Sequence, residues 1–479
     1  MHPRIIASVL GAVVAATGAA MLVPASLSYL VSDGYWVSFV LPAAAALLAG
    51  GALFALSRGR PSAYVSIRDV FLMVVLGWIS VAAVGSLPFY LSGFMFPVEA
   101  FFNSMAGFTT TGVSTTEELP PSLLLWRSMS QWFGGIGIVV LFVAVAPLVG
   151  FGAAQLYSAE AATPLAERLT PRIRDTAKVL TYIYVSLTVV LTAALLVAGM
   201  GPFDAANHAL TTVATGGYST RPGSIAAFDS LAVELVLVAG MIFSGTNFAL
   251  YFQAVRGRLG EALTNAEYLA YLALILFATA VMTASLYAFD YQQSPLMALR
   301  LALFQSASLM TGTGFSTADW DSWDPLSQAL LIVLMGIGGC AGSTSGGIKV
   351  VRALLLTKNA LQDAFRMVHP RAVTALKLGR KVLPERLRGS LLGFFFVYVA
   401  TLVAGTLLMA LHQVPLGAAF GSAFACLNIT GTAPGAPGDP AFYAELPATA
   451  KLVLSLLMLL GRLELFTVLA ILTPAFWRG

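Results

Sequence analysis

The sequence predicts an all-α polytopic membrane protein with two extra N-terminal transmembrane helices, followed by four tandem repeats of one structural unit. Composition indicates the class: 58% of the 479 residues are hydrophobic, only 10% are charged, and the mean hydropathy is +0.84. Ordinary soluble domains carry about 25% charged residues, so a chain this apolar belongs in a lipid bilayer. Recurrence indicates the repeat, because four polar, glycine-centred loops each follow a short apolar segment.

Long apolar segments recur along the whole chain and predict the spans. Each is long enough to cross ~30 Å of hydrocarbon at ~1.5 Å per residue. They cover residues 5–30, 36–57, 69–92, 123–150, 177–200, 229–254, 267–290, 326–357, 389–412 and 448–476. The first segment also suits a cleaved signal peptide. Its apolar run is longer than a usual signal core and another span follows, so we expect a retained transmembrane helix.

Four shorter segments lie between spans and are too short to cross the bilayer, which is typical of re-entrant half-helices. They cover 97–109, 203–214, 297–311 and 416–429, and the polar loops that follow read TTTGVST, ATGGYST, TGTGFST and NITGTAP. The central glycines of these loops, Gly112, Gly217, Gly314 and Gly431, are 105, 97 and 117 residues apart. A recurrence near 100 residues indicates a fused fourfold repeat.

A polar residue nine positions before each central glycine supports this alignment; the four are Asn103, His208, Gln305 and Ser422. We therefore expect two N-terminal transmembrane helices at 1–62 and four pore repeats. The repeats cover 63–165, 166–260, 261–385 and 386–479, and the third has a broken second helix.

Charge predicts the orientation. Basic residues gather in the segments 58–68, 168–178, 256–258 and 349–388, which the positive-inside rule assigns to the cytoplasm together with both termini. The polar loops then open toward an outer face that carries Glu99, Glu117, Glu118, Asp204, Asp319, Asp321, Asp324, Asp439 and Glu445. Acidic residues there raise the local concentration of cations, although ordinary solvated loops are the alternative.

Four such loops suit an ion filter. Irregular backbone at membrane depth is tolerated only where it lines water or is buried in protein. A half-helix that enters from outside directs the negative end of its dipole toward the centre of the membrane, and glycine allows successive carbonyls to turn toward one axis. Rings of carbonyl oxygens are how cation filters replace hydration water. We therefore expect a pseudo-fourfold arrangement around one pore. Simple turns between packed helices are the alternative.

Five stretches carry a resemblance to a known family. They are FFNSMAGFTTTGVSTTEELP, LLLWRSMSQWFGGIGIVVLFVAVAP, HALTTVATGGYSTRPGSIAAF, MGIGGCAGSTSGGIKVVR and MLLGRLELFTVLAILTPAFWR. In these motifs the chain resembles the Trk/Ktr/HKT superfamily of potassium transporters, and the two extra leading spans suit its bacterial Trk branch. The resemblance covers essentially the whole chain. It implies potassium uptake across the bacterial inner membrane through a selective pore, with K⁺ as the bound and transported ion.

The resemblance also implies the filter residues, with one central glycine in each filter loop. They are Thr110, Thr111, Gly112 and Val113; Thr215, Gly216, Gly217 and Tyr218; Gly312, Thr313, Gly314 and Phe315; and Ile429, Thr430, Gly431 and Thr432. The fourth loop departs most from the pattern, because TAPGAPG follows Gly431 where the other loops have Val or an aromatic residue and then Ser-Thr. That departure leaves the carbonyl positions of the fourth quarter open.

A glycine-rich stretch, GIGGCAGSTSGGIK at 336–349, interrupts the second span of the third repeat. Glycine costs ~1 kcal/mol relative to alanine in a helix interior, so we expect an unwound segment beside the pore. The resemblance implies that it gates the pore through Gly338, Gly339, Gly342, Ser343, Thr344, Ser345, Gly346, Gly347 and Lys349. Lys349 has an alternative role, in which its ammonium reaches the cytoplasm. The G-x-G-x-x-A pattern here lacks the βαβ context of a dinucleotide site.

Two further charges lie within predicted spans, where charges are costly and usually face a cavity or a partner. Arg462 stands in MLLGRLELF, and the resemblance places it below the filter as a positive barrier to cations. A salt bridge is the alternative; Glu464, two residues away, does not face it on a helix. Glu234 has no assignable role from the sequence.

The partners follow from the resemblance as well. It implies a homodimer and a cytosolic nucleotide-binding regulatory subunit, for which the basic segments 151–178 and 349–388 are candidate docking surfaces. We expect lipid as a neighbour, no nucleic acid, no organic cofactor and no enzymatic activity, because no catalytic carboxylate or histidine pair lies within the spans. The competing functions are an ion-coupled secondary transporter, which often shows inverted repeats, and a less selective K⁺/Na⁺ pathway.

Overall fold

The computed structural model describes residues 1–57, 66–116, 118–149, 173–292, 294–372, 374–379, 381–384, 386–432, 435 and 439–478. In these ranges, six helices are long and apolar enough to cross a membrane, or up to eight if each of two bent helix pairs is one span. Arg58, Arg60, Glu117, Arg168, Arg172, Arg380 and most of the predicted docking segment 151–178 lie outside the described residues.

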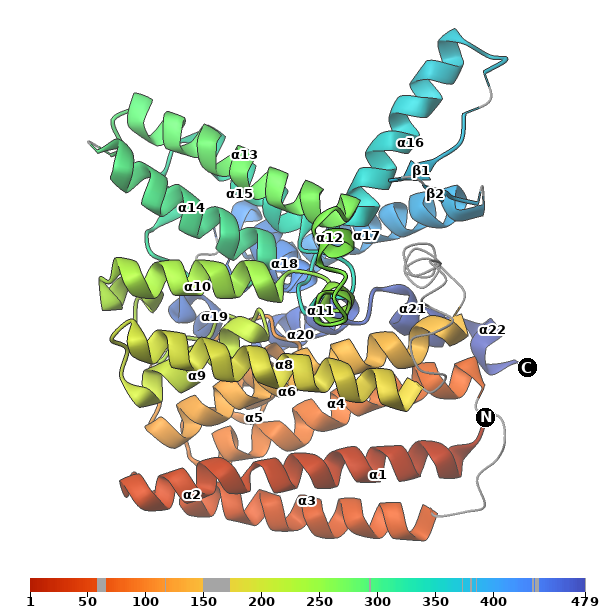
Figure 1. Cartoon of the computed structure of the whole chain (residues 1–479). Coiled ribbons are helices and arrows are strands. Elements are labelled where there is room, and N and C mark those ends of the chain that lie inside the picture. Colours follow the sequence, from red (N-terminus) through yellow and green to blue (C-terminus); the bar gives the residue numbers. More distant parts are fainter. Residues whose placement is uncertain are drawn as a thin grey trace. The chain divides into compact units, whose positions relative to one another are not determined.

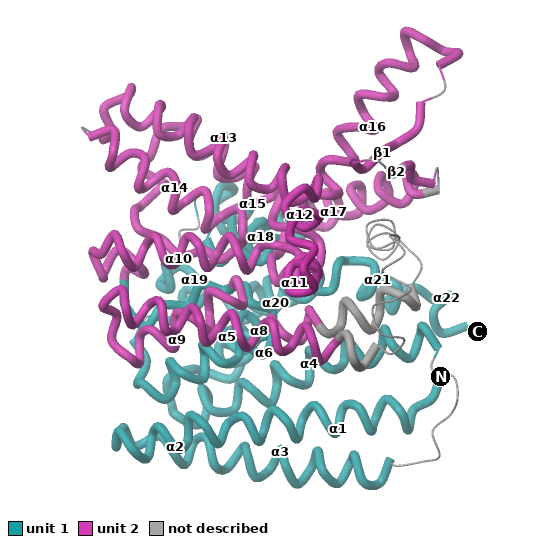
Figure 2. The backbone as a smooth tube through the Cα atoms, viewed as in Figure 1, with its two compact units in different colours: residues 1–134, 216–222, 405–479 teal, residues 135–215, 223–404 magenta. Residues whose placement is uncertain are grey.

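The regular secondary structure of the described residues is mostly helical (Figure 1). The strands in these ranges form one small antiparallel hairpin of β1 (Lys377–Leu378) and β2 (Lys381–Val382). Two compact units are coloured separately in Figure 2. Unit 1 comprises residues 1–134, 216–222 and 405–479, and unit 2 comprises 135–215 and 223–404.

Unit 1 contains the N-terminal helices, the first half-helix and the end of the chain. Its helices are α1 (Pro3–Ala20), α2 (Leu22–Val31), α3 (Trp36–Ser57), α4 (Ile67–Leu91), α5 (Pro97–Phe108), the first part of α6 (Pro121–Val149), the end of α17 (Arg386–Leu411), α18 (Leu416–Asn428), α19 (Pro440–Glu445), α20 (Ala448–Arg462), α21 (Phe466–Leu472) and α22 (Pro474–Trp477). The neighbouring helices α1 and α3 pack closely, and glycine makes this possible. At Gly50, for example, a Cβ would lie only 2.6 Å from the Ala15 nitrogen. Small residues allow such close helix packing in membranes.

Unit 2 contains the middle of the chain. Its elements are the rest of α6, α8 (Ile173–Val197), α9 (Pro202–Val213), η1 (Ser224–Phe228), α10 (Leu231–Ser244), α11 (Phe248–Val255), α12 (Leu259–Leu263), α13 (Ala266–Ala288), α14 (Pro295–Thr311), η2 (Trp320–Ser322), α15 (Pro325–Ile337), α16 (Val350–Val368), the hairpin and most of α17. Within this unit α14 packs against α10, α13 and α15.

The four short helices predicted from the sequence are confirmed as separate helices: α5, α9, α14 and α18. Three of them have proline in the first turn, where a missing N–H costs nothing and φ is already suited to a helix. Each ends within a few residues of its loop glycine, so the polar loop begins where the helix stops.

The predicted break in the segment 326–357 is also confirmed, because α15 ends at Ile337 and α16 begins at Val350. Two further predicted spans, 229–254 and 448–476, are bent helix pairs. In the first, α10 and α11 meet at a bend of 93°, and in the second, α20 and α21 meet at one of 117°. Hydropathy alone misses these bends because the residues that make them are few.

Local chemistry explains both bends. After α10, the Asn247 side chain accepts a hydrogen bond from the Ala249 nitrogen at 2.9 Å and starts α11 as a new helix. After α20, Glu464 and Leu465 both have a φ of 57°, which no helix interior tolerates. In consequence, the second spans of repeats 2, 3 and 4 all stop partway, after the 14, 13 and 15 residues of α10, α15 and α20.

Candidate functional site

One backbone pattern recurs in all four predicted filter loops. In each loop the central glycine has a positive φ, as does the residue two positions before it, and the residue between them does not. Backbone that alternates in this way turns successive peptide groups to one side, the conformation that aligns carbonyl oxygens in an ion filter. The pairs are Thr110 (60°) and Gly112 (84°), Thr215 (53°) and Gly217 (73°), Gly312 (73°) and Gly314 (79°), and Ile429 (59°) and Gly431 (73°).

The fourth loop follows this pattern despite its different sequence. Ile429 is β-branched, and a positive φ at such a residue is a genuine outlier that costs about 1–3 kcal/mol. Strain of this kind persists only where the surrounding structure imposes it. The loop backbone therefore has the register in which Gly431 matches the other three glycines, although residues 433 and 434 lie outside the described chain.

Hydrogen bonds repeat with the backbone. The nitrogens of Thr111, Thr313 and Thr430 each donate to the carbonyl oxygen five residues earlier, at 2.8, 2.9 and 3.1 Å. Hydrogen bonds between threonine hydroxyls repeat as well. The Thr109 and Thr111 hydroxyl oxygens are 2.9 Å apart, and those of Thr311 and Thr313 are 2.7 Å apart. These bonds satisfy the ends of α5, α14 and α18, so that the helix ends and the loops form one continuous structure.

The polar column predicted from the sequence is buried in all four half-helices: Asn103, His208, Gln305 and Ser422 are at most 1% exposed. Asn103 donates to the Thr115 hydroxyl at 2.7 Å and accepts from the Ser114 hydroxyl at 3.0 Å. Gln305 donates to the Ser316 hydroxyl at 3.1 Å. These two side chains thus hold the outgoing limb of their own loops, in repeats 1 and 3.

Loop residues from three repeats meet within unit 1. A Cβ on Gly112 would lie 2.1 Å from the Gly216 oxygen, and a Cβ on Gly431 would lie 2.7 Å from the Thr111 oxygen. No larger residue fits these approaches without movement of the backbone. The Tyr218 hydroxyl also donates to the Val113 carbonyl oxygen at 2.7 Å, which joins the second loop to the first.

The segment 338–349 is folded back on itself. A Cβ on Gly338 would lie 2.2 Å from the Gly346 oxygen, so the two limbs of the segment touch through their backbones. The Lys349 nitrogen donates to the Ile337 carbonyl oxygen at 2.7 Å, which closes the base of the loop. Lys349 is only 9% exposed, and its ammonium donates to the Ser345 carbonyl oxygen. The lysine thus holds its own segment in this structure.

Neighbouring elements of unit 2 anchor the same segment. The Cys340 nitrogen donates to the Gly245 oxygen at 2.9 Å, at the bend between α10 and α11. Glu267 of α13 is 1% exposed and accepts from the nitrogens of Ala341, at 2.6 Å, and Val351, at 3.2 Å. The Thr344 hydroxyl approaches loop 2, because the Thr215 hydroxyl donates to it at 3.2 Å.

Arg462 is the last residue of α20 and is 3% exposed. Its Nη2 donates to the Gly134 carbonyl oxygen on α6 at 2.8 Å. Gly134 in turn touches the end of α5, since a Cβ there would lie 2.0 Å from the Phe108 oxygen. The guanidinium therefore lies near the end of α5, where the first polar loop begins, within unit 1.

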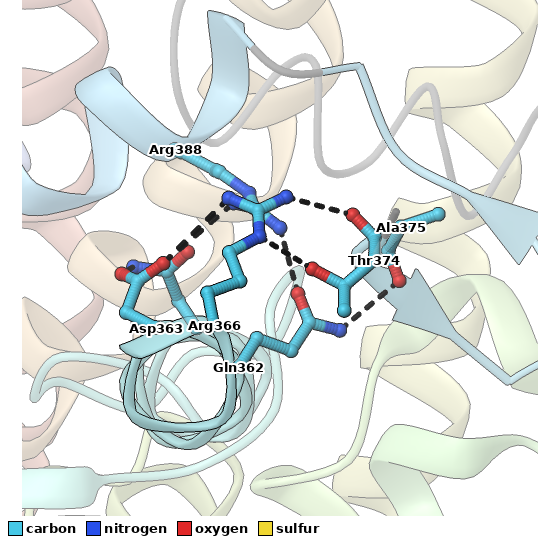
Figure 3. A network of polar contacts seen from close by, with 7 residues as sticks. Gln362, Asp363, Arg366, Thr374, Ala375 and Arg388 are labelled. Atoms are coloured by element: carbon cyan, nitrogen blue, oxygen red, sulfur yellow. Dashed lines mark hydrogen bonds and ion pairs between the residues drawn. The ribbon is translucent and has the colours of Figure 1, made fainter. Parts of the chain in front are cut away.

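The described residues of the predicted docking segment 349–388 belong to unit 2. Six of them, with Ala341 and Leu391, form an apolar cluster: Val351, Leu355, Leu376, Leu378, Leu383 and Leu387. Figure 3 shows polar contacts of the same segment: Arg366 donates to the Thr374 hydroxyl at 2.7 Å, and Arg388 donates to the Gln362 side chain at 2.7 Å. Two basic residues of this segment are thus engaged within the chain itself.

Sequence reasoning missed three buried polar residues at this site: Arg127 and Gln131 on α6, and Glu267 on α13. They are 5%, 0% and 1% exposed, respectively. A signal was available, because a charged or amide side chain inside a membrane span usually has a functional or pairing role. Arg127 and Gln131 are also four residues apart, which places them on one face of a helix.

Comparisons with known proteins agree over the full length. The family model described as "TrkH: Cation transport protein" matches residues 39–476. The "Trk system potassium uptake protein TrkH" of Halomonas elongata is 39% identical over 487 residues, and that of Escherichia coli K12 is 38% identical over 485, each match covering 100% of both chains. The crystal structure of the potassium transporter TrkH from Vibrio parahaemolyticus superimposes with a TM-score of 0.92 at 38% identity, again over 100% of both chains. The chain is an integral membrane protein that belongs to the TrkH family.

Proposed function

We propose that this chain takes up potassium across the bacterial inner membrane through a selective pore. The observation that carries the proposal is the backbone pattern of paired positive φ values, which recurs in all four loops at the positions aligned from the sequence. Four segments with the same backbone pattern suit the carbonyl rings that replace the hydration shell of a cation. The names of the relatives, which are potassium uptake proteins, support potassium as that cation.

The proposed filter consists of Thr110 to Val113, Thr215 to Tyr218, Gly312 to Phe315 and Ile429 to Thr432. Threonine hydroxyls add acceptor oxygens beside the carbonyls. All four central glycines are present, which favours potassium over sodium within the superfamily that the sequence resembles. The proposed pore repeats are those expected from the sequence, at 63–165, 166–260, 261–385 and 386–479.

The segment 338–349 is the proposed gate. Its support is its burial, its return on itself, and the hydroxyl contact between Thr344 and Thr215 of the second loop. The gate opens when the bonds at Gly245 and Glu267 are released and the segment moves away from the loop. Arg462 is the proposed barrier, because a buried positive charge near the base of the filter opposes a cation that passes it.

A homodimer and a TrkA-like cytosolic nucleotide-binding subunit complete the proposal. The Trk system names of the relatives support a multi-component system. The segment 349–388 is the proposed docking surface, with Lys358, Arg371 and Lys377 as candidate contacts. Both termini are assigned to the cytoplasm and the filter to the outer face, following the distribution of basic residues.

The test is uptake of radioactive rubidium into liposomes that contain only the purified chain, with potassium, sodium or lithium as competitor. Potassium should block the uptake strongly and sodium weakly. Equal block by both ions would overturn the potassium assignment. Uptake that requires an organic co-substrate would favour a secondary transporter. A chain that conducts only after a candidate regulator is added would support the regulatory part of the proposal, so that arm is measured in parallel.

A further inference from the structure

Two polar side chains of α6 contact the second filter loop, and neither is part of the proposed filter itself. Arg127 and Gln131 lie one helical turn apart, and both are buried. The loop residues that they contact, 216–219, belong to the same compact unit as this part of α6. Their contacts lie on both sides of Gly217, the central glycine of the loop.

Gln131 uses both ends of its amide on this loop. Its Nε2 donates to the Gly216 carbonyl oxygen at 2.7 Å, and its Oε1 accepts from the Tyr218 nitrogen at 3.2 Å. The two bonds fix the orientation of the peptide groups before and after Gly217. A single side chain thereby determines which way the Gly216 carbonyl faces.

The Gln131 amide packs directly against the Gly216 backbone. A Cβ on Gly216 would lie 2.3 Å from the Gln131 amide carbon, so a side chain there would displace the amide from the loop. The same Gly216 oxygen lies 2.1 Å from where a Cβ on Gly112 would stand. The Gly216 oxygen that Gln131 binds is therefore also the atom at which the second loop meets the first.

Arg127 extends the contact outward. Its Nη2 donates to the Ser219 carbonyl oxygen at 2.6 Å, and its Nη1 lies 3.4 Å from both the Ser114 hydroxyl and the Thr116 oxygen. The guanidinium carbon is 4.6 Å from the centroid of the Tyr218 ring, within the range of a cation–π contact. A planar guanidinium reaches these groups at once, which the single ammonium of lysine cannot do.

We infer that Gln131 and Arg127 are positioning residues that set the conformation of the second filter loop against the first, and thereby the preference for potassium over sodium. The inference rests on the proposed function, because it concerns the selectivity of that filter. The physical reason is that discrimination between two ions of equal charge depends on the number and direction of the carbonyl dipoles presented to them. Gln131 fixes the peptide groups on both sides of Gly217 and so limits which directions the carbonyls of this loop can take.

The experiment compares the block of rubidium uptake by potassium and by sodium in purified variants. Gln131→Met removes both hydrogen bonds at similar length, Gln131→Glu keeps the acceptor and removes the amide donor, and Arg127→Lys keeps the charge without the planar fork. The potassium-to-sodium block ratio should fall about three- to tenfold in each, the factor that corresponds to the net worth of roughly one hydrogen bond. The amount of folded protein is measured separately by size-exclusion chromatography.

Gln328 supplies a matched control. Its amide donates to the carbonyl oxygens of Asp321 and Trp323 at 2.6 and 2.9 Å, away from the filter loops. Gln328→Met should leave the block ratio unchanged. If Gln131→Met does not fold, the Gln131→Glu and Arg127→Lys variants carry the test.

The two levels of failure are distinguishable. A parent chain without selective rubidium uptake would overturn the proposed function. A selective parent chain whose folded Gln131 and Arg127 variants keep the same block ratio would overturn this inference alone. A ratio that falls equally in the Gln328 variant would also overturn it, because the effect would then be a general loss of stability.

Discussion

Arg300 and Glu234 form a two-point ion pair within unit 2, with Nε to Oε2 at 2.7 Å and Nη2 to Oε1 at 2.8 Å. Arg300 lies on the third half-helix, α14, and Glu234 on α10, the second span of the repeat before it. Glu234, which had no role from the sequence, therefore ties one repeat to the next half-helix. Unit 1 holds a related pair, in which the Lys451 ammonium on α20 lies 2.7 Å from Glu99 Oε1 on α5.

Loss of one partner of this pair should destabilise the protein. The Glu234 side chain is 6% exposed and that of Arg300 is 24% exposed, so we expect a loss for Glu234→Ala near the lower end of the ~3–5 kcal/mol typical of broken buried pairs. The measurement is the thermal unfolding midpoint of the detergent-solubilised chain. The double variant Glu234→Arg, Arg300→Glu restores opposite charges and should recover part of the loss; a double variant no better than the single one would argue against the pair.

A side chain at Gly112 should impair the filter far more than one at an unobstructed glycine. Gly112→Ala places a Cβ 2.1 Å from the Gly216 oxygen, so the two loops must separate. We expect the potassium-to-sodium block ratio to collapse toward one. Gly34→Ala is the matched control, since Gly34 has a φ of 87°, close to the 84° of Gly112, and no atom within 4 Å of its Cβ position. Similar behaviour of the two variants would mean that backbone strain, not loop contact, matters.

Gly217→Ser tests the second loop in the same assay. Gly217 has a φ of 73°, a backbone region that serine adopts only with strain. Its neighbours on both sides are held by Gln131, so the loop cannot relax freely. The variant should weaken the preference for potassium over sodium. An unchanged ratio would remove this loop from the filter.

Removal of the proposed barrier should increase flux. Arg462→Ala deletes a buried charge near the base of the first loop. Because unit charges several ångströms apart interact by a few kcal/mol at an effective dielectric constant of about 20, we expect rubidium uptake to rise at least ~10-fold. Arg462→Lys keeps the charge and should remain slow. A folded Arg462→Ala protein with slower uptake would assign the arginine a structural role instead.

Weakening the anchor of the proposed gate should favour its open state. Glu267 accepts two backbone hydrogen bonds, one from Ala341 within the folded-back segment and one from Val351 at the start of α16. In Glu267→Gln these bonds lose their charge assistance, and a loss of about 1.4 kcal/mol would raise a small open population about tenfold. Uptake without any regulatory subunit should increase accordingly. Glu261→Gln, on the exposed surface of α12, is the control; increased uptake there as well would contradict a specific anchor.

The Asp33 carboxylate predicts a dependence of stability on pH. Burial alone raises the pKa of this group, but hydrogen bonds from Ser28, Ser122 and the Tyr35 nitrogen outweigh it and hold the pKa below its usual value. A lowered pKa in the folded state means that the carboxylate stabilises the protein above pH ~3.9, the value in the unfolded chain, and less as the pH falls through the folded pKa.

Thermal midpoints of the parent chain and Asp33→Asn should accordingly differ at neutral pH and converge toward pH 3. Glu445→Gln, at an exposed position, should show no such convergence. A difference between the parent and Asp33→Asn that stays constant from pH 7 to pH 3 would show that the ionised form has no special role.

The sequence by itself determined the class, the family, the four half-helices and the alignment of the four loops. These features depend on composition, hydropathy and spacing, which are visible in the sequence. An apolar run of sufficient length indicates a membrane span. A short segment that begins with proline and ends near glycine indicates a short helix followed by a loop. The break after Ile337 was visible for the same reason, because glycine density marks it.

Tertiary structure decided what the loops contact. The bends after Ser244 and Arg462 depend on a cap and on two left-handed residues that hydropathy does not register. The register of the fourth loop depends on Ile429 being forced to a φ of 59°. The pairing of Glu234 with Arg300 and the two bonds of Gln131 join residues 66 and more than 80 positions apart. Such contacts form only when packing brings distant segments together. A buried polar group is costly unless it has a hydrogen-bond partner, and that partner is supplied by the tertiary structure and not by any local preference of the chain.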